Sequence, residues 1–283
     1  MNKPNWDDIR FVLTVAQCGS LNSASAKLGV THATVMRRVA AFEASHGQKI
    51  FQKSPSGYKT LPEALPILRA MENIEEATLA MERTIAGADQ SPSGSVRIAS
   101  TDSLCYLMLP SIVAKISERF PKIQITLLSA NLHHDLSRLS ADIVVRATKY
   151  LEDGLTGESP GKLSVAPYSN GEPDLKWMRL EGVLASSIPA QWLASNVPED
   201  QFITGSDSFP VLQQLAANGM GKALLPEFVG DADPSLKKLD DIVPDFGVPI
   251  WVATLTEFAH VPRILSVQKM LVKEFKSSKY FQN

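Results

Sequence analysis

The spacing of apolar residues in the first 45 positions predicts three short helices separated by tight turns. Apolar residues recur every three or four positions over residues 6–17, 21–28 and 31–45, which is the period of an amphipathic helix. Ser20 and Thr31 stand before or at the start of the second and third segments, where a hydroxyl oxygen can accept hydrogen bonds from free backbone N–H groups. Because the turn between these two segments is short and contains glycine, the pattern indicates a helix-turn-helix.

The two faces of the third predicted helix differ in chemistry. At 100° per residue, three apolar residues gather on one side and should face the core, namely Val35, Val39 and Phe42. Arg37 points almost to the opposite side, with Ala33 and Met36 beside it. A guanidinium group can donate two hydrogen bonds to a guanine edge, so this outer face is expected to read bases in the major groove. The alternative is that the charges of Arg37 and Arg38 only keep the helix solvated.

Four further residues of this region are candidates for DNA contacts. Thr31, His32 and Thr34 lie at the N-terminal end of the predicted recognition helix, the end that helix-turn-helix proteins place against bases. Arg38 lies at the border of the buried face, and we expect it to reach a phosphate.

Residues 49–61 are expected to form a β-hairpin. Residues 54–57, Ser-Pro-Ser-Gly, fit a type I turn with proline in its second and glycine in its fourth position. Lys53 and Lys59 flank the tip, where they should contact phosphate oxygens and fix register without reading sequence. We interpret this hairpin as the wing of a winged helix-turn-helix domain spanning residues 1–61.

Charge is distributed unevenly along the chain. Residues 1–60 hold eight Lys or Arg against three Asp or Glu, a net charge of +5, whereas the whole chain has a net charge of −2, which leaves −7 for the remainder. A basic head on an acidic body is expected of a phosphate-binding module attached to a domain with another task.

A seven-residue apolar repeat runs through residues 62–88 and predicts a long helix. Its two core positions alternate at spacings of three and four, with Ala64, Met71, Thr78 and Ile85 in one and Ile67, Ile74 and Met81 in the other. We interpret it as a linker helix that pairs with a second copy of the chain, giving a homodimer or homotetramer. The alternative is a helix packed on its own domain. Pro66 should kink this helix or mark its start, because proline removes a backbone donor.

After a hinge over residues 89–94, strand and helix patterns alternate, which indicates an α/β domain with a parallel sheet. Expected strands cover residues 95–99, 123–128, 142–146, 163–167, 182–186, 201–204, 221–225 and 249–255. Expected helices cover residues 109–119, 133–139, 189–194, 209–218 and 262–275. We expect a first subdomain of residues 95–162 and 258–283, and a second of residues 163–257.

Polar residues follow several predicted strands, at the edge where α/β sheets bind ligands. Hydroxyl groups and one arginine there would suit a small polar or anionic molecule, held partly by backbone N–H groups at a helix N-terminus. The candidate effector-binding residues are Ser100, Thr101, Asp102, Ser103, Ser129, Asn131, Arg146, Thr148, Thr204 and Ser206. For any one of them, the alternative is ordinary capping.

Several short motifs carry a family resemblance. They are Gly19-Ser20-Leu21, Ala24, Leu28, Thr31-His32-Ala33, Arg37-Arg38-Val39, Phe42-Glu43, Gly47 and Ile50-Phe51, followed in the C-terminal half by residues 218–226 and 259–263. With this spacing the chain resembles the LysR-type transcriptional regulators, although Met36 stands where that family usually has a small Ser. The resemblance implies an N-terminal winged helix-turn-helix, a dimerising linker helix, and two α/β subdomains that resemble periplasmic binding proteins, with a cleft between them.

Enzymatic functions find little support in the sequence. It has no nucleotide-binding glycine fingerprint, phosphate-binding loop or Gly-x-Ser-x-Gly elbow, so we expect no enzyme and no cofactor. Residues 133–135, His-His-Asp, are interpreted as a solvated helix start rather than a metal site, because adjacent side chains on a helix diverge. Cys105 stands near a helix N-terminus, where the pKa of a thiol can fall, so a redox-sensing role is kept as a hypothesis.

The function we expect is a sequence-specific DNA-binding transcriptional regulator whose C-terminal domain senses a small polar or anionic effector. Its expected partners are double-stranded DNA, the effector, a second copy of the chain and RNA polymerase. No segment reaches the ~18 to 20 apolar residues of a membrane span, so we expect a cytoplasmic protein without a membrane partner. The alternative is a solute-binding or enzymatic α/β protein with an incidental helical N-terminal module.

Overall fold

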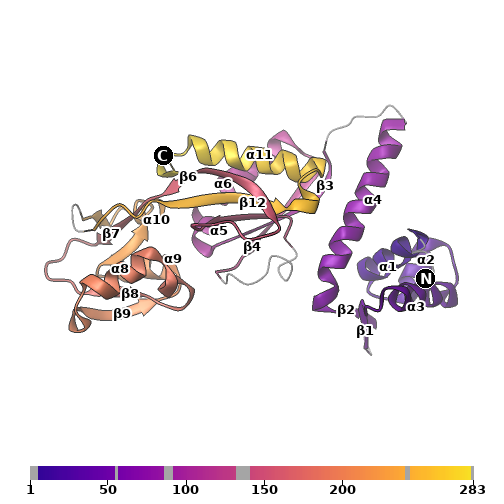
Figure 1. The fold of residues 1–283 in the computed structure, drawn as a ribbon, viewed down its shortest axis with the longest axis horizontal. Coiled ribbons are helices and arrows are strands. Elements are labelled where there is room, and N and C mark those ends of the chain that lie inside the picture. Colours follow the sequence, from indigo (N-terminus) through magenta and orange to yellow (C-terminus); the bar gives the residue numbers. More distant parts are fainter. Residues whose placement is uncertain (1–5, 55–56, 86–91, 132–140, 240–242, 282–283) are drawn as a thin grey trace. The chain divides into compact units, whose positions relative to one another are not determined.

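The computed structural model describes residues 6–54, 57–85, 92–131, 141–239 and 243–281 (Figure 1). The chain divides into two compact units, and among the described residues the first contains those up to 85 and the second those from 92 onward. The predicted helix over residues 133–139 and the His-His-Asp motif lie outside the described residues.

The N-terminal unit contains three helices and a hairpin. These are α1 (Trp6–Cys18), α2 (Leu21–Leu28), α3 (His32–His46), β1 (Phe51–Ser54) and β2 (Gly57–Thr60). The Ser20 hydroxyl accepts a hydrogen bond from the Ser23 N–H, and the Thr31 hydroxyl accepts one from the Thr34 N–H, so both predicted N-caps are confirmed. Gly29 ends α2 with a φ of 67°, a conformation that glycine adopts without steric cost.

The hairpin is attached to the turn between α1 and α2. The Tyr58 N–H donates to the Gly19 carbonyl at 2.9 Å, and a Cβ at Gly57 would lie 2.5 Å from that same carbonyl oxygen. Gly57 also has a φ of 123°. Only glycine fits this position, and the close approach sets where the hairpin leaves the helical core.

The linker helix packs partly on its own unit. A 3₁₀ turn (Pro62–Ala64) leads into α4 (Leu65–Ile85), whose first turn holds Pro66, so this proline marks the start of the helix. Ala64, Leu68 and Met71 are buried in the same core as α1, whereas Thr78 and Met81 are exposed. The prediction of a partner-facing seam along the whole helix is therefore wrong for its first two turns, because α1 covers them.

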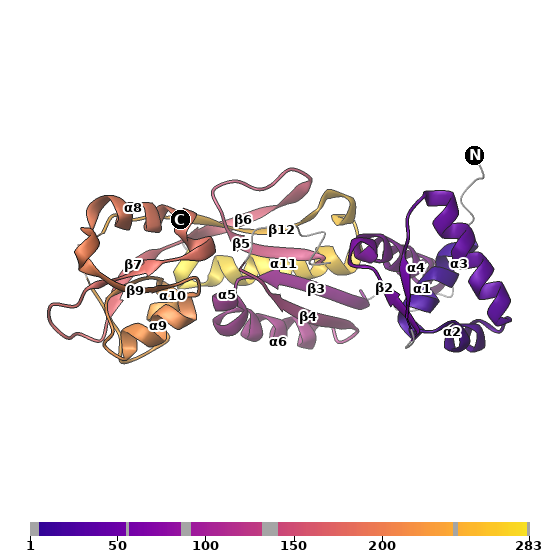
Figure 2. The same ribbon diagram turned by 90° about the horizontal axis from the view of Figure 1, so that it is seen from below.

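The second unit contains a five-stranded mixed sheet with the order β4-β3-β5-β12-β6 (Figure 2). Its strands are β3 (Gly94–Ser100), β4 (Ile123–Ser129), β5 (Ile143–Ala147), β6 (Leu155–Leu163) and β12 (Val248–Leu255). Two helices, α6 (Leu109–Arg119) and α11 (Pro262–Ser277), contact each other and the sheet, and a third, α5 (Asp102–Leu107), follows β3. β3, β4 and β5 are parallel as predicted, but β12 runs antiparallel to both β5 and β6.

A smaller set of elements follows β6. The strands are β7 (Val165–Ser169), β8 (Trp177–Leu180), β9 (Phe202–Ser206), β10 (Ala223–Pro226) and β11 (Lys237–Lys238). The helices are α8 (Ile188–Asn196), α9 (Phe209–Ala217) and α10 (Glu227–Gly230), with short 3₁₀ turns at Gly182–Ser186, Glu199–Gln201, Thr256–Phe258 and Lys279–Phe281. β10 and β11 flank β7 in an antiparallel sheet, and β8 pairs with β9 in parallel.

Two sequence predictions in this region are corrected. Residues 182–186 form a 3₁₀ turn instead of a strand, and the strand lies earlier, at Trp177–Leu180. The segment 249–255 is a strand, but it belongs to the sheet of the first subdomain instead of the second, because its partners are β5 and β6. The chain therefore crosses between the two sheets twice, from β6 to β7 and on the way back to β12.

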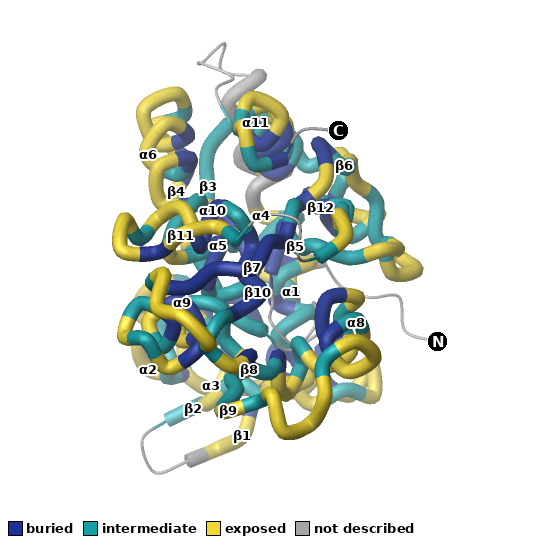
Figure 3. Tube along the Cα trace, turned by 90° about the vertical axis from the view of Figure 1, so that its left-hand side faces the viewer, coloured by how far each residue is buried: buried dark blue, intermediate teal, exposed yellow. Residues whose placement is uncertain are grey.

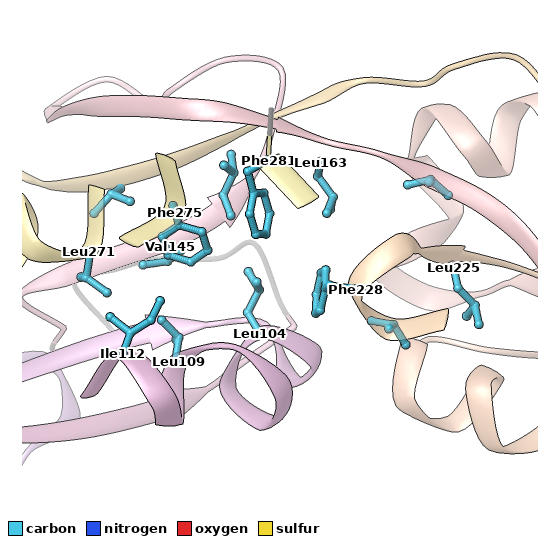
Figure 4. Packing of buried hydrophobic residues seen from close by; sticks show 14 of the residues in the cluster. Leu104, Leu109, Ile112, Val145, Leu163, Leu225, Phe228, Leu271, Phe275 and Phe281 are labelled. Atoms are coloured by element: carbon cyan, nitrogen blue, oxygen red, sulfur yellow. The ribbon is translucent and has the colours of Figure 1, made fainter. Parts of the chain in front are cut away.

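One hydrophobic core runs through both subdomains. Figure 3 shows buried segments concentrated along β7 and β10, and Figure 4 shows Leu104 of α5 close to Phe228 of α10 where the subdomains meet. Within the described ranges, none of the helices combines the length and hydrophobicity that a membrane crossing requires.

Candidate DNA-binding and effector-binding sites

The outer face of α3 carries Arg37. The helix is held by the burial of three residues on its other side, Val35, Val39 and Phe42. Arg37 is exposed, and its side chain forms no ion pair or hydrogen bond with any other described residue. Ala33, Met36 and Ala40 on the same face are exposed as well. This arrangement leaves one guanidinium group free to donate to a ligand, with two alanines and a methionine on the same face.

Arg38 has a partner inside the N-terminal unit. Its Nη1 donates to Asp8 Oδ1 at 2.8 Å, and its guanidinium carbon lies 5.4 Å from the centroid of the Phe11 ring. The Asp8 side chain is 10% exposed. These contacts join α3 to α1, so Arg38 helps to fix the orientation of α3 within the N-terminal unit.

The remaining predicted DNA-binding residues are at the surface. Thr31 and Thr34 bond to each other through their hydroxyls at 2.9 Å, and His32 beside them is exposed. Lys53 and Lys59 on the hairpin are exposed as well. Lys53 pairs with Tyr58 and Lys59 with Gln52, so the two lysines lie on opposite faces of the hairpin.

A buried carboxylate connects α3 to the hairpin. Glu43 Oε1 accepts hydrogen bonds from the Ile50 N–H at 2.8 Å and the Phe51 N–H at 3.2 Å, and Oε2 accepts one from Lys49 at 2.9 Å. Burial alone would raise the pKa of Glu43, but these hydrogen bonds together outweigh it and hold the pKa below its ordinary value. Glu43 therefore sets where β1 begins relative to the recognition helix. The sequence reasoning assigned it no role.

A cavity of about 520 Å³ lies between the two subdomains of the second unit. Six of the ten predicted effector-binding residues line it, namely Thr101, Asp102, Ser103, Asn131, Arg146 and Thr148. The second subdomain contributes apolar residues and four polar ones to the lining, namely Val183, Leu184, Ile188, Pro189, Phe209 and Pro226 with Ser186, Ser187, Gln191 and Asp207. The sequence pattern did not indicate these apolar residues, because only polar residues that follow strands were expected at a ligand site.

Arg146 is a half-buried cation that lines this cavity. Its Nη2 donates to the Ala130 carbonyl at 3.2 Å, and burial lowers its pKa from the ordinary value, opposed by the charge of Glu152. Guanidinium groups remain protonated in proteins, so Arg146 keeps a positive charge in the lining of the cavity. Lys149 also lines the cavity and is exposed.

The four other predicted residues lie elsewhere. Ser100 is fully buried, and its hydroxyl donates to the Val145 carbonyl at 2.7 Å, so it connects β3 to β5 inside the sheet. Ser206 accepts from the Ser208 N–H at 3.2 Å, and Thr204 lies on β9 away from the cavity wall. Ser129 lines a second depression between α5 and α9.

Polar contacts join the subdomains at one edge of the cavity. The Ser208 hydroxyl donates to Asp102 Oδ2 at 2.6 Å, and it also caps α9. Asn131 accepts from the Asp102 N–H at 3.0 Å through its side-chain oxygen, and its amide nitrogen donates to the Asp207 carbonyl at 3.4 Å. Asp102 and Asn131 belong to the first subdomain, whereas Asp207 and Ser208 belong to the second.

The environment of Cys105 raises the pKa of its thiol. Burial and the neighbouring charge of Asp102 bring this pKa to about 11, the opposite direction to the lowering that a redox-sensing thiol needs. In the described part of the chain, no cluster of three or more His, Cys, Asp or Glu could hold a metal ion.

Comparison with known protein families assigns both units. A model for the bacterial regulatory helix-turn-helix proteins of the LysR family matches residues 6–64. A model for the LysR substrate binding domain matches residues 89–162.

Curated relatives cover most of the chain. A Mau operon transcriptional activator of Paracoccus denitrificans is 26% identical over 232 residues, which are 80% of each chain. The transcriptional regulator CrgA of Neisseria meningitidis is 21% identical over 252 residues, 84% of each chain. These relatives are transcriptional regulators, so the alternative of a solute-binding or enzymatic protein finds no support.

Solved structures show the same fold at low sequence identity. A full-length OxyR variant from Pseudomonas aeruginosa aligns with a TM-score of 0.72 at 15% identity, over 98% of this chain and 99% of that one. Full-length LysG from Corynebacterium glutamicum with its bound effector Arg aligns with a TM-score of 0.68 at 15% identity, over 96% and 98% of the two chains. The predicted fold class is confirmed, and the chain belongs to the LysR family of transcriptional regulators, with a DNA-binding helix-turn-helix and an effector-binding domain.

Proposed function

We propose that this LysR-type regulator reads its operator with the outer face of α3 and controls transcription in response to a small carboxylate with an apolar body. The observation that carries the DNA-binding part is the free, exposed guanidinium group of Arg37 on a helix whose opposite face is buried. Thr31, His32 and Thr34 lie at the N-terminal end of the same helix and would contact bases or nearby phosphates. Lys53, Lys59 and Arg38 would contribute positive charge toward phosphates.

The DNA-binding proposal is tested by comparing two substitutions in the full-length protein. Arg37→Ala removes a candidate base contact, so discrimination between selected and random duplexes should fall by roughly tenfold or more. Lys59→Ala removes a candidate phosphate contact, so affinity for both duplexes should fall by a similar factor and the salt dependence should become shallower. If Arg37→Ala leaves discrimination unchanged, the assignment of this face to base reading is wrong.

The effector proposal rests on a cavity that combines a cation with apolar side chains. The first subdomain contributes Arg146, Asn131 and hydroxyl groups, and the second contributes most of the apolar lining beside Ser186, Ser187, Gln191 and Asp207. A cavity of about 520 Å³ has the size of sites for small organic molecules. A carboxylate group would bond to Arg146, and an apolar body would pack against Phe209 and Leu184.

We further propose that the regulator acts as a homodimer or a larger assembly through the second half of α4. Met81 is 56% exposed and Thr78 is exposed in the single chain, and both continue the seven-residue repeat. Two copies would then present two recognition helices to a two-fold related DNA site. The protein would work in the cytoplasm, where it would act on RNA polymerase at the promoters that it binds.

A further inference from the structure

Met36 is an exposed apolar side chain on the outer face of α3. It is 46% exposed, whereas Val35 and Val39 of the same helix are almost fully buried. Ala33 and Ala40, about one turn away on either side, carry only methyl groups, and the exposed His32 is the longer neighbour one turn toward the N-terminus. A methionine in water forgoes the stabilisation that burial would provide, so an apolar group that covers it would contribute to binding.

The rotation of α3 places Met36 beside Arg37. The buried side chains of Val35 and Val39 hold one face of α3 in the core. The ion pair between Arg38 and Asp8 holds the neighbouring face of α3 against α1. The outward direction of Met36 is therefore set by contacts on the other sides of the helix.

We propose that Met36 reads a thymine by packing its thioether against the C5-methyl group in the major groove. Thymine is the only standard base that presents a methyl group there, and an apolar side chain is the group that recognises it. The unbranched, polarizable methionine side chain can adjust its three torsions to reach that methyl group. The combination with Arg37 would give α3 two neighbouring readers, one for a guanine edge and one for a thymine methyl. This inference rests on the proposed placement of α3 in the major groove.

The test removes the methyl group from the DNA and the thioether from the protein. Preferred duplexes are first selected from a randomised library with the full-length protein. Each thymine of a selected duplex is then replaced by 2′-deoxyuridine, which lacks only the C5-methyl group, and dissociation constants are measured by fluorescence anisotropy. The proteins compared are the wild type, Met36→Ala and Met220→Ala, a control methionine that is 44% exposed in the effector domain.

At one thymine in each half-site, deoxyuridine should weaken wild-type binding by roughly fourfold, the effect of one buried methyl-sized group. Met36→Ala should bind the thymine and deoxyuridine duplexes equally, with an affinity near that of the wild type for the deoxyuridine duplex. Met220→Ala should keep the full fourfold difference. In a duplex that carries cytosine at this position, 5-methylcytosine should restore part of the affinity for the wild type only.

The proposal is overturned if no deoxyuridine replacement weakens the wild type, or if Met36→Ala remains as sensitive to each replacement as the wild type. The Arg37→Ala variant distinguishes a wrong role for Met36 from a wrong placement of α3 on DNA. If Arg37→Ala loses discrimination while Met36→Ala does not, α3 lies in the groove but Met36 reads no methyl group. If neither substitution changes sequence preference, or no preferred duplex can be selected, the placement of α3 itself is wrong. Unchanged thermal unfolding of Met36→Ala, expected for an exposed residue, shows that the variant is folded.

Discussion

The Ser208 hydroxyl donates a hydrogen bond to Asp102 Oδ2 at 2.6 Å, across the boundary between the two effector subdomains. Ser208 stands at the start of α9, and Asp102 lies in the first turn of α5. The same Ser208 oxygen accepts from the Val211 N–H at 3.4 Å, and Asp102 Oδ1 accepts from the Ser103 N–H at 2.6 Å. Each residue therefore stabilises its own helix start and also bonds to the other subdomain.

Ser208→Ala should lower the free energy of unfolding by about 2 kcal/mol, because it removes both a helix cap and a hydrogen bond to a charged group. Ser208→Asp keeps a capping acceptor but sets a second carboxylate against Asp102, so it should be destabilising too. Urea unfolding of the full-length protein measures both, with Ser266→Ala as a control in the middle of α11. Wild-type stability of Ser208→Asp would show that the contact between subdomains contributes nothing.

Arg146→Gln should weaken carboxylate binding in the cavity. Charge-assisted hydrogen bonds to a guanidinium are worth about 1.5–3 kcal/mol, so affinity should fall by roughly tenfold or more. The measurement is the thermal shift of the full-length protein with a series of carboxylates, from acetate to benzoate and branched-chain acids. The apolar lining predicts larger shifts for the longer acids.

Thr204→Ala serves as the matched control for Arg146→Gln, because Thr204 lies away from the cavity wall. It should respond to each carboxylate as the wild type does. Equal thermal shifts for Arg146→Gln and the wild type would remove Arg146 from the effector site.

Glu43→Gln should destabilise the protein at neutral pH but not in acid. The pKa of Glu43 is lowered by its hydrogen bonds in the folded state, so ionised Glu43 stabilises the fold above its unfolded pKa, and this contribution is lost as the pH falls through the folded value. We expect a difference of about 2 kcal/mol at pH 7 that shrinks toward zero below the folded pKa. Thermal unfolding across this range measures it, with exposed Glu75→Gln as control, and a difference independent of pH would contradict the assignment.

Cys105 should react slowly with iodoacetamide. With a pKa of about 11 in the folded protein, against 9.0 ordinarily, only a small fraction is thiolate at pH 8. In a Cys18→Ser background, labelling should accelerate by roughly tenfold on unfolding in urea, since the higher intrinsic reactivity of a high-pKa thiolate offsets part of the difference. Peroxide treatment should leave DNA binding unchanged, and a rapid loss of binding would restore the redox hypothesis.

Met71 and Met81 should behave differently although both belong to the same seven-residue repeat. Met71→Lys places a charge in the core shared with α1, where Met71 is 3% exposed, so the N-terminal unit should unfold. Met81→Lys should leave that unit folded and weaken self-association by roughly tenfold or more, measured by sedimentation velocity over a range of concentrations. Unchanged association would show that the exposed half of α4 is not the contact between copies.

The sequence by itself determined the local features of this protein. The buried face of α3, its Thr31 cap and the bounds of α2 and α6 follow from residues within a few positions of one another, so period and capping predict them. The family could also be identified in this way, because its motifs lie mainly in the compact N-terminal module. Met36 could be placed on the outer face from the helical period alone.

Only the tertiary structure decided which distant segments meet. β12 returns to pair with β5 about 100 residues earlier, and Arg38 pairs with Asp8 30 residues earlier. The lining of the cavity and the bond between Asp102 and Ser208 likewise join residues far apart in the chain. Strand partners and buried ion pairs depend on the energy of contacts between residues far apart in the chain, and local propensity contains no information about these contacts. The apolar period that predicts a strand therefore does not predict which strands lie beside it or in which direction it runs.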